Sequence, residues 1–296
     1  MRTLALGEIL WDIIDGKAHI GGSPFNVAVH LAKMGAESHL VSSVGADHLG
    51  TSANEHARNF GVHTGFITTL QDKPTGTVLV ELKDGQPTYD IVEGVAWDQI
   101  TLDEGQIADL LATNWDYLIF ASLAQRTEAN RLLYRRILDK INATDIFFDV
   151  NLRQSYFDKE IVESSLNYTT ILKLNDEEVS TISNLIYGKS LDFKAFAERT
   201  SETYNAHTIC ITRGADGVLV YSKGHFYDIP GVKVTVADTV GAGDSFSAAF
   251  LYTFKRTGDA ALAAERGCQL GAFVASQNGA VPDYTEALNI ALEIST

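Results

Sequence analysis

Short apolar runs alternate with amphipathic segments along most of the chain. The runs have the length of strands, and the segments between them repeat apolar residues at helical spacing. This alternation predicts strands at 3–7, 38–44, 116–121, 145–150, 170–174 and 208–212, with a β pair at 218–221 and 225–229. The predicted helices after residue 101 cover 102–112, 126–141, 158–167, 176–186, 192–204, 243–256, 259–276 and 284–294. Such an order implies a largely parallel sheet that is covered on both faces.

Polar residues and a proline begin the first predicted helix. Ser23 is a favourable N-cap, Pro24 suits the first helical position, and Gly35 lies where a C-cap glycine is expected. The apolar stripe of this helix consists of Val27, Ala28, Leu31 and Ala32. A second helix is expected to follow the segment 45–50 and to end near Gly61.

The pattern changes between about residue 62 and residue 98. Thr75 to Leu82 and Thr88 to Val92 alternate in polarity, and Asp84-Gly85 between them is a strong hairpin signal. This block has no helical pattern, and the chain shows no repeat or linker. We therefore expect one domain, 1–296, with a small β lid contributed by about 11–21 and 63–98.

Composition narrows the class of protein. The 296 residues carry a formal net charge of -15, which argues against a broad nucleic-acid or membrane surface. No apolar run approaches the ~20 residues of a membrane span, and the first residues lack the apolar core of a signal peptide. The two cysteines, Cys210 and Cys268, show neither metal-ligand spacing nor a disulfide framework. We expect a cytoplasmic protein without a nucleic-acid or membrane partner.

A glycine-rich turn with an aspartate precedes one of the last helices. Backbone N–H groups at a helix start are unpaired, and the macrodipole adds roughly half a positive charge there. Gly241, Ala242 and Gly243 would therefore cradle a phosphate or a developing negative charge, with Asp244 beside it as a proton acceptor. The same residues would also suit an ordinary helix start.

Two better-known phosphate motifs are excluded by single positions. The dinucleotide fingerprint needs a third glycine three residues after the second, and Phe246 stands there. A Walker A loop would end in Gly188-Lys189-Ser190, but Ser183 occupies the place of its first glycine.

The wider pattern resembles one family. The stretch 238–246 closely resembles the C-terminal signature of the ribokinase/PfkB family of carbohydrate kinases, and 21–35 with 44–50 resembles its N-terminal signature. Both occur in the expected order, and the resemblance covers essentially the whole chain. Within the family, 149–153 and 95–98 are most similar to bacterial fructokinases. The resemblance implies an α/β fold, a ribokinase-like three-layer α/β/α sandwich with a largely parallel central sheet and a small β lid.

The resemblance also implies a reaction, the transfer of a phosphoryl group from ATP to a sugar hydroxyl. Asp244 matches the family's general base, a role typically worth ~10²–10⁴-fold. Gly241, Ala242 and Gly243 match its anion hole. The positions that match the sugar contacts are Asp12, Gly22 and Asn26, with Arg153 as a further contact to the sugar or the transferred phosphate.

The nucleotide end follows from the same resemblance. Asn175 and Glu178 match an element that helps to place Mg²⁺ and phosphates through water; by themselves they also read as an N-cap and its capping-box partner. The positions that match contacts to ATP are Thr212, Gly214, Gly217 and Asn278. Some members bind a monovalent cation such as K⁺ through a residue that matches Asp238.

The resemblance to fructokinases implies fructose as the sugar. Segment 11–30 carries one lysine, Lys17, and no arginine, which favours an unphosphorylated substrate because a phosphate needs cationic partners. The alternatives are a kinase for 2-keto-3-deoxygluconate, ribose or a nucleoside, and a non-catalytic sugar sensor on the same fold. An oxidoreductase is disfavoured by Phe246. The lid is also a candidate surface for a homodimer.

Overall fold

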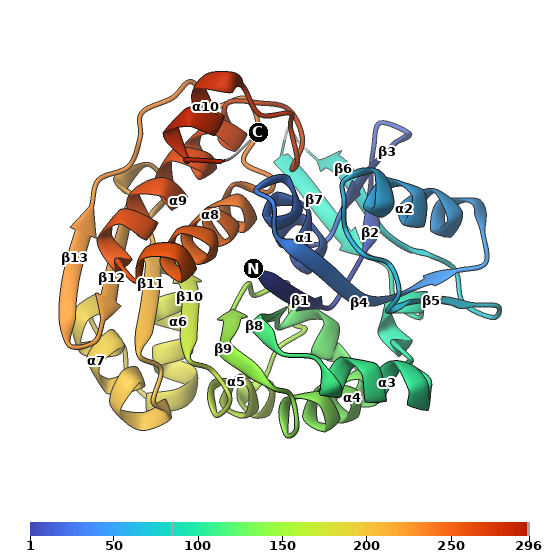
Figure 1. Ribbon diagram of the computed structural model, residues 1–296, viewed down its shortest axis with the longest axis horizontal. Helices are drawn as coiled ribbons and strands as arrows, with labels where there is room; N and C mark the ends of the chain where they lie inside the picture. The colour runs from blue at the N-terminus through green and yellow to red at the C-terminus, as the bar shows by residue number, and fades with distance from the viewer. Residues whose placement is uncertain (84–85, 295–296) are drawn as a thin grey trace.

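A nine-stranded sheet forms the middle layer of the protein, for which the computed structural model describes residues 1–83 and 86–294. The strand order is β13-β12-β11-β10-β9-β8-β1-β4-β5 (Figure 1). All pairs from β11 to β5 are parallel, whereas β12 and β13 add an antiparallel edge. The strands are β1 (Arg2–Leu6), β4 (Glu37–Gly45), β5 (Ile67–Leu70), β8 (Trp115–Ala121), β9 (Ala143–Asp149), β10 (Ile171–Asn175), β11 (Thr208–Thr212), β12 (Val218–Ser222) and β13 (His225–Ile229).

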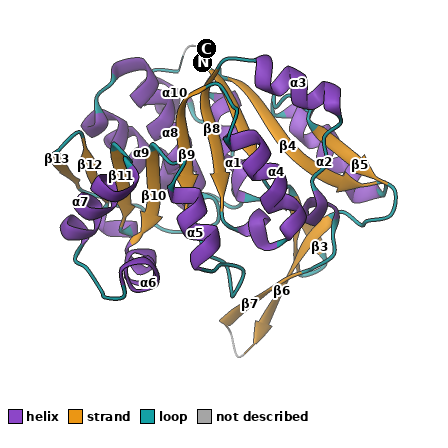
Figure 2. Cartoon of the chain, turned by 90° about the horizontal axis from the view of Figure 1, so that it is seen from below, coloured by secondary structure: helices purple, strands orange, loops and turns teal. Residues whose placement is uncertain are grey.

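Helices cover both faces of this sheet (Figure 2). One layer consists of α1 (Ser23–Lys33), α2 (His48–Asn59), α8 (Ala242–Thr257), α9 (Ala260–Ala275) and α10 (Glu286–Ala291). The other consists of α3 (Glu104–Ala112), α4 (Glu128–Leu138), α5 (Lys159–Leu166), α6 (Asp176–Tyr187) and α7 (Phe193–Tyr204). Short 3₁₀ turns are η1 (Ala96–Gln99), η2 (Leu123–Arg126) and η3 (Gly214–Asp216). Across the described ranges, no helix has both the length and the apolar character that a bilayer crossing needs.

Two hydrophobic cores explain why the central strands read as continuous apolar runs. In β1, Ala5 packs into the core under α1 and α8, whereas Leu4 and Leu6 pack into the core under α3 and α4. Both faces of a parallel strand are thus buried, and each fully buried leucine contributes ~1.5–3 kcal/mol. The predicted three-layer α/β/α fold with a largely parallel sheet is confirmed.

A second, four-stranded sheet forms the lid, in the order β3-β2-β6-β7. Its strands are β2 (Leu10–Ile14), β3 (Lys17–Gly21), β6 (Gly76–Lys83) and β7 (Gln86–Ile91), and it projects from one edge of the sandwich (Figure 2). Part of the predicted lid segment lies elsewhere: 67–70 form β5 of the main sheet, and 96–99 form η1. The predicted turn at Asp84-Gly85 lies outside the described residues.

The start of α1 corrects one sequence expectation. The N-cap is Gly22, with φ 110°, and Ser23 is the first helical residue. A Cβ on Gly22 would lie 2.4 Å from the Glu8 carbonyl oxygen, so only glycine fits at this approach. Ser23 therefore does not cap the helix with its side chain, and its hydroxyl is free to bond elsewhere.

The contact between the lid and the sandwich predicts a stability effect at Gly76. A Cβ there would lie 2.2 Å from Nε1 of the fully buried Trp97. We expect Gly76→Ala to lower the free energy of unfolding by about 1–3 kcal/mol through overpacking, measured by urea denaturation. Gly65→Ala is the matched control, because nothing lies within 4 Å of its Cβ position. Equal stability of the two variants would contradict the close approach.

Candidate active site

The candidate site lies where the strand order of the sheet reverses. From β1 the chain proceeds to β4 on one side, whereas β8, β9 and β10 continue on the other side. Ligands of such sheets bind outside the carboxyl ends of the strands at this reversal. Glu8 follows β1, Asp149 ends β9, and the first turn of α8 lies above them.

Asp244 is held by two side chains from the first turn of α1. The Ser23 hydroxyl donates to Oδ1 at 2.6 Å, and the Asn26 amide Nδ2 donates to Oδ2 at 2.8 Å. Positions 23 and 26 are three apart, so they lie on the same face of the helix. Both carboxylate oxygens are therefore oriented, and each keeps a lone pair for a further donor.

Ser23 is a site residue that the sequence did not identify. Because a serine before a proline is typical of a helix N-cap, the sequence did not indicate that its hydroxyl contacts Asp244. The available signal was its spacing: a hydroxyl lies three positions before Asn26, on the helix face that carries the predicted sugar contact.

The glycines before Asp244 leave unpaired donors at the start of α8. The first helical bond runs from the Ser245 N–H to the Gly241 carbonyl at 2.9 Å. The N–H groups of Gly243 and Asp244 have no hydrogen-bond partner among the described residues. Gly241 adopts a left-handed φ of 77°, and a Cβ on it would lie 2.6 Å from the Ala280 Cβ. The backbone can thus receive an anion as the glycine pattern predicts.

Glu8 is a second carboxyl group at the start of α1. It is 1% exposed, its Oε1 accepts the Ser23 N–H at 3.2 Å, and its Oε2 is buried without a hydrogen-bond partner. Its pKa is raised to about 7, mainly by burial and also by the nearby charge of Asp244, against the opposing effect of backbone donors and Arg153. The sequence offered no sign of this group, because a glutamate after a strand is ordinarily exposed.

A buried ion pair lies beneath the anion-binding turn. Lys173 on β10 donates to both oxygens of Asp149 at 3.1 and 2.9 Å, and both side chains are nearly inaccessible. Burial raises the pKa of Asp149 to about 6 against the opposing pull of Lys173, so the pair is ionised at neutral pH. A Cβ on Gly243 would lie 3.2 Å from Lys173 Nζ, which places this ammonium directly under the turn.

Asn175 and Glu178 form a complete capping box at the start of α6. The Asn175 side chain accepts the Glu178 N–H at 2.8 Å, and Glu178 Oε2 accepts the Asn175 N–H at 2.8 Å. Glu178 Oε1 accepts the Leu152 N–H, also at 2.8 Å. One lone pair remains on each Glu178 oxygen, which fits contact with a hydrated Mg²⁺ through water rather than direct coordination.

The predicted sugar contacts lie around the lid strand β2. Burial raises the pKa of Asp12 to about 6, against the opposing charges of His19 and Arg153. Gly21 and Gly22 let this strand pass close to its neighbours: a Cβ on Gly21 would lie 2.8 Å from Asp12 Oδ2. Arg153 is exposed and donates to its neighbour's carbonyl, but its charge acts on both Asp12 and Glu8.

The predicted nucleotide contacts lie further along the sheet. Thr212 ends β11, and a turn through Gly214 and Gly217 leads into β12. A Cβ on Gly217 would lie 2.0 Å from the Ile229 carbonyl oxygen, so the turn packs tightly against the end of β13. Asn278 is exposed after α9, and Asp238 accepts the N–H groups of Val240 and Gly279. Asp238 is close enough to the sugar contacts for its charge to raise the pKa of Asp12.

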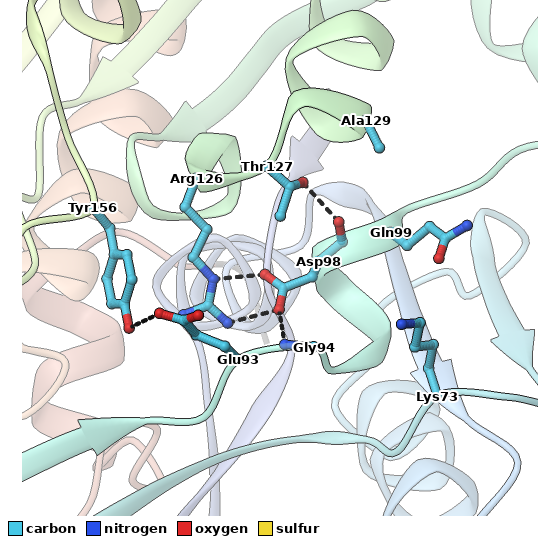
Figure 3. A pocket seen from close by; sticks show the side chains of 9 residues that line it. All are labelled: Lys73, Glu93, Gly94, Asp98, Gln99, Arg126, Thr127, Ala129 and Tyr156. Atoms are coloured by element: carbon cyan, nitrogen blue, oxygen red, sulfur yellow. Dashed lines mark hydrogen bonds and ion pairs between the residues drawn. The ribbon is translucent and has the colours of Figure 1, made fainter.

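A pocket of about 300 Å³ lies at the base of the lid rather than at Asp244 (Figure 3). Its floor is the bidentate pair between Arg126 and Asp98, with the guanidinium between the rings of Trp97 and Tyr156. Arg126 also donates to the Val92 carbonyl at 2.6 Å. This cluster fixes the end of β7 to η2, and none of the predicted site residues lines the pocket.

Comparison with known proteins identifies the family. A family model described as pfkB family carbohydrate kinase matches residues 8–287. The chain therefore belongs to the pfkB family of carbohydrate kinases.

Three relatives show how the chain compares within this family. It is 28% identical over 271 residues to a sugar kinase of Pyrococcus horikoshii, with 83% of this chain and 80% of the relative covered. It is 28% identical over 270 residues to a fructokinase of Escherichia coli, with 87% and 85% covered. It is also 28% identical over 300 residues to an ATP-dependent ribose-1-phosphate kinase of Halopiger xanaduensis, with 95% and 94% covered.

Solved structures agree with the fold. The crystal structure of the Pyrococcus horikoshii sugar kinase superposes with a TM-score of 0.81, 25% identity and coverage of 98% of this chain and 97% of that chain. A structure of the same kinase in complex with ATP superposes with a TM-score of 0.78 and 26% identity over 95% and 94% of the two chains. The ribokinase-like fold is thus confirmed.

The buried Glu8 carboxyl predicts a pH-dependent stability. Its pKa is about 7 in the folded protein and near 4.5 when unfolded, so the native state holds the extra proton in between. This group therefore stabilises the folded protein fully below pH 4.5. As the pH rises from 4.5 through 7, the free energy of unfolding falls by about 3 kcal/mol. We expect the free energy of unfolding of Glu8→Gln, relative to wild type, to rise by that amount between pH 4.5 and 8. Urea denaturation at each pH measures it, and a constant difference would contradict the assignment.

The Asp149–Lys173 pair predicts an asymmetry between single and double replacement. Asp149→Asn leaves a buried ammonium without its main partner and should cost about 3–5 kcal/mol of stability. The double variant Asp149→Leu with Lys173→Met removes both charges and should recover most of that loss. Urea unfolding of the three proteins measures the effect. A double variant that is less stable than Asp149→Asn would contradict it.

Proposed function

We propose that the protein phosphorylates a hydroxyl group of an unphosphorylated sugar at the expense of ATP, with fructose as the first candidate. The observation that supports this most directly is the pair of hydrogen bonds from Ser23 and Asn26 to Asp244. They orient a carboxylate beside unpaired backbone donors, so that a proton acceptor and an anion site are adjacent.

Each proposed role follows from the chemistry of phosphoryl transfer. Asp244 accepts the proton of the attacking hydroxyl, which becomes acidic late because the transition state is loose. The N–H groups of the turn 241–243 meet the charge on the transferring oxygens, and losing one such donor costs ~3–4 kcal/mol in other enzymes. Bound ATP would supply the phosphoryl group, with Mg²⁺ neutralising its charge.

Residues on either side of Asp244 hold the two substrates. Asp12, Gly22 and Asn26 would bind sugar hydroxyls, with Arg153 nearby. The residues proposed for the nucleotide and its Mg²⁺ are Asn175, Glu178, Thr212, Gly214, Gly217 and Asn278. Asp238 is proposed to hold K⁺, which a titration of turnover with K⁺ at constant ionic strength would detect.

The charge around the sugar end supports an unphosphorylated substrate. Two carboxyl groups with raised pKa values, Glu8 and Asp12, face this region, and Lys17 is exposed on the lid. A sugar phosphate would bring a dianion towards these acids, and among the described residues the cationic side chains that act on them are His19 and Arg153. The ribose-1-phosphate activity of one relative is therefore disfavoured for this chain.

A panel of acceptors tests the proposal. ADP release with Mg-ATP should occur with fructose and be weak with ribose, 2-keto-3-deoxygluconate, nucleosides and ribose 1-phosphate. Turnover only with another member of the panel would replace fructose. Binding of a sugar without any turnover would favour a sensor.

Asp244→Asn tests the role of the base. We expect the variant to keep its fold and its ATP affinity but to lose at least about a hundredfold in kcat, the usual share of a general base. The matched control is Asp259→Asn, which alters another aspartate at a helix start, the N-cap of α9. Steady-state kinetics and calorimetry with ATP make the comparison. Undiminished kcat would remove Asp244 from this role.

A further inference from the structure

Helix α1 carries a polar stripe in addition to its apolar one. Ser23, Asn26, His30 and Lys33 are spaced by three, four and three residues, so they share one face of the helix. Every member bonds to the C-terminal part of the chain. Ser23 and Asn26 bond to Asp244, and the other two bond to residues 280–284. This helix therefore does more than fill the core.

The segment 278–284, here called the strap, lies between α1 and the glycine turn. His30 Nε2 lies 2.9 Å from the Ala280 carbonyl oxygen, and Lys33 Nζ donates to the Pro282 carbonyl at 2.6 Å. On its other side Ala280 packs against Gly241, where a Cβ would lie 2.6 Å from the Ala280 Cβ. The strap thus transmits the position of α1 to the turn that forms the anion site.

The hydrogen bonds define the state of the His30 ring. A carbonyl only accepts, so Nε2 carries the hydrogen towards Ala280, and Nδ1 accepts from the Tyr284 hydroxyl at 2.6 Å. The side chain is fully buried, and this burial lowers its pKa to about 4. Lys33 is the nearby cation and lowers it further, whereas the bond to Ala280 raises it. The ring is therefore neutral at physiological pH and acts as a fixed donor.

We propose that His30 is a positioning residue for phosphoryl transfer, because it holds the strap, and through it Gly241, in register with Asp244. This inference rests on the proposed roles of Asp244 and of the glycine turn. Helix α1 then positions two groups. Its first turn orients Asp244, and its third turn, through His30 and the strap, orients the glycine turn at 241–243. Displacing reacting groups by about 1 Å can cost ~10²-fold in rate.

Two substitutions separate positioning from packing. His30→Leu keeps an apolar body of similar size but removes the donor to Ala280. His30→Gln keeps a side-chain N–H near the position of Nε2. We expect His30→Leu to lower kcat at least tenfold with little change in the KM for sugar, and His30→Gln to keep kcat within about threefold of wild type.

A matched control addresses stability alone. Tyr187→Phe removes one side-chain hydrogen bond, between the hydroxyl groups of Tyr187 at the end of α6 and Thr200 on α7, in the opposite helix layer. It should lower the melting temperature without changing kcat. If His30→Leu keeps wild-type kcat at a temperature where all variants are folded, the positioning role is overturned. Equal losses in His30→Leu and His30→Gln would overturn it as well.

Amide hydrogen exchange gives a readout that does not depend on turnover. Without the donor at position 30, exchange in 278–284 and 239–243 should become faster, while exchange in β8 and β9 stays unchanged. If the wild type phosphorylates no sugar, the proposed function fails, and this measurement alone decides whether His30 holds the strap and the glycine turn in place. Unchanged exchange in both segments of His30→Leu would then reject it.

Discussion

The hydrogen bonds from Ser23 and Asn26 to the Asp244 carboxylate connect the start of α1 to the start of α8. Ser23 and Asn26 lie 221 and 218 residues before Asp244, and the rest of the site depends on that junction. The parallel sheet makes the junction possible, because it places the loops after β1 and the first turn of α8 over the same edge.

Buried ionisable groups surround the junction. Glu8, Asp149 and Lys173 are nearly inaccessible, and each influences or is influenced by Asp244. Burying a charge costs several kcal/mol unless it is paired, so this arrangement does not arise from stability alone. The site therefore gives up part of the stability of the fold to hold these ionisable groups beside Asp244.

The fold was predictable from the chain because its cause is local. Alternating apolar runs such as β1 and amphipathic segments such as α6 determine the layers, and the glycine spacing at 241–243 indicates where the proposed anion site begins. The contacts of Ser23, Glu8 and His30 were not predictable, because each depends on partners more than a dozen residues away. Ser23 fitted the pattern of a helix N-cap, and Lys173 lies in an otherwise apolar strand. The sequence around them therefore gave no indication that Ser23 contacts Asp244 or that Lys173 contacts Asp149. The edge strand β5 was assigned to the lid for the same reason. Its four residues do not indicate which strand they pair with, and in the structure they pair with β4.

The central place of α1 has a consequence for synthesis on the ribosome. At ~5–20 residues per second, on the order of ten to forty seconds separate the emergence of α1 from that of α8. During this interval Phe25, Val29 and Leu31, which are fully buried in the finished protein, lack the residues of α8 and α9 that share their core. The nascent chain must keep this surface from associating with other chains. Chaperone demand should accordingly concentrate on the interval before the last sixty or so residues are made.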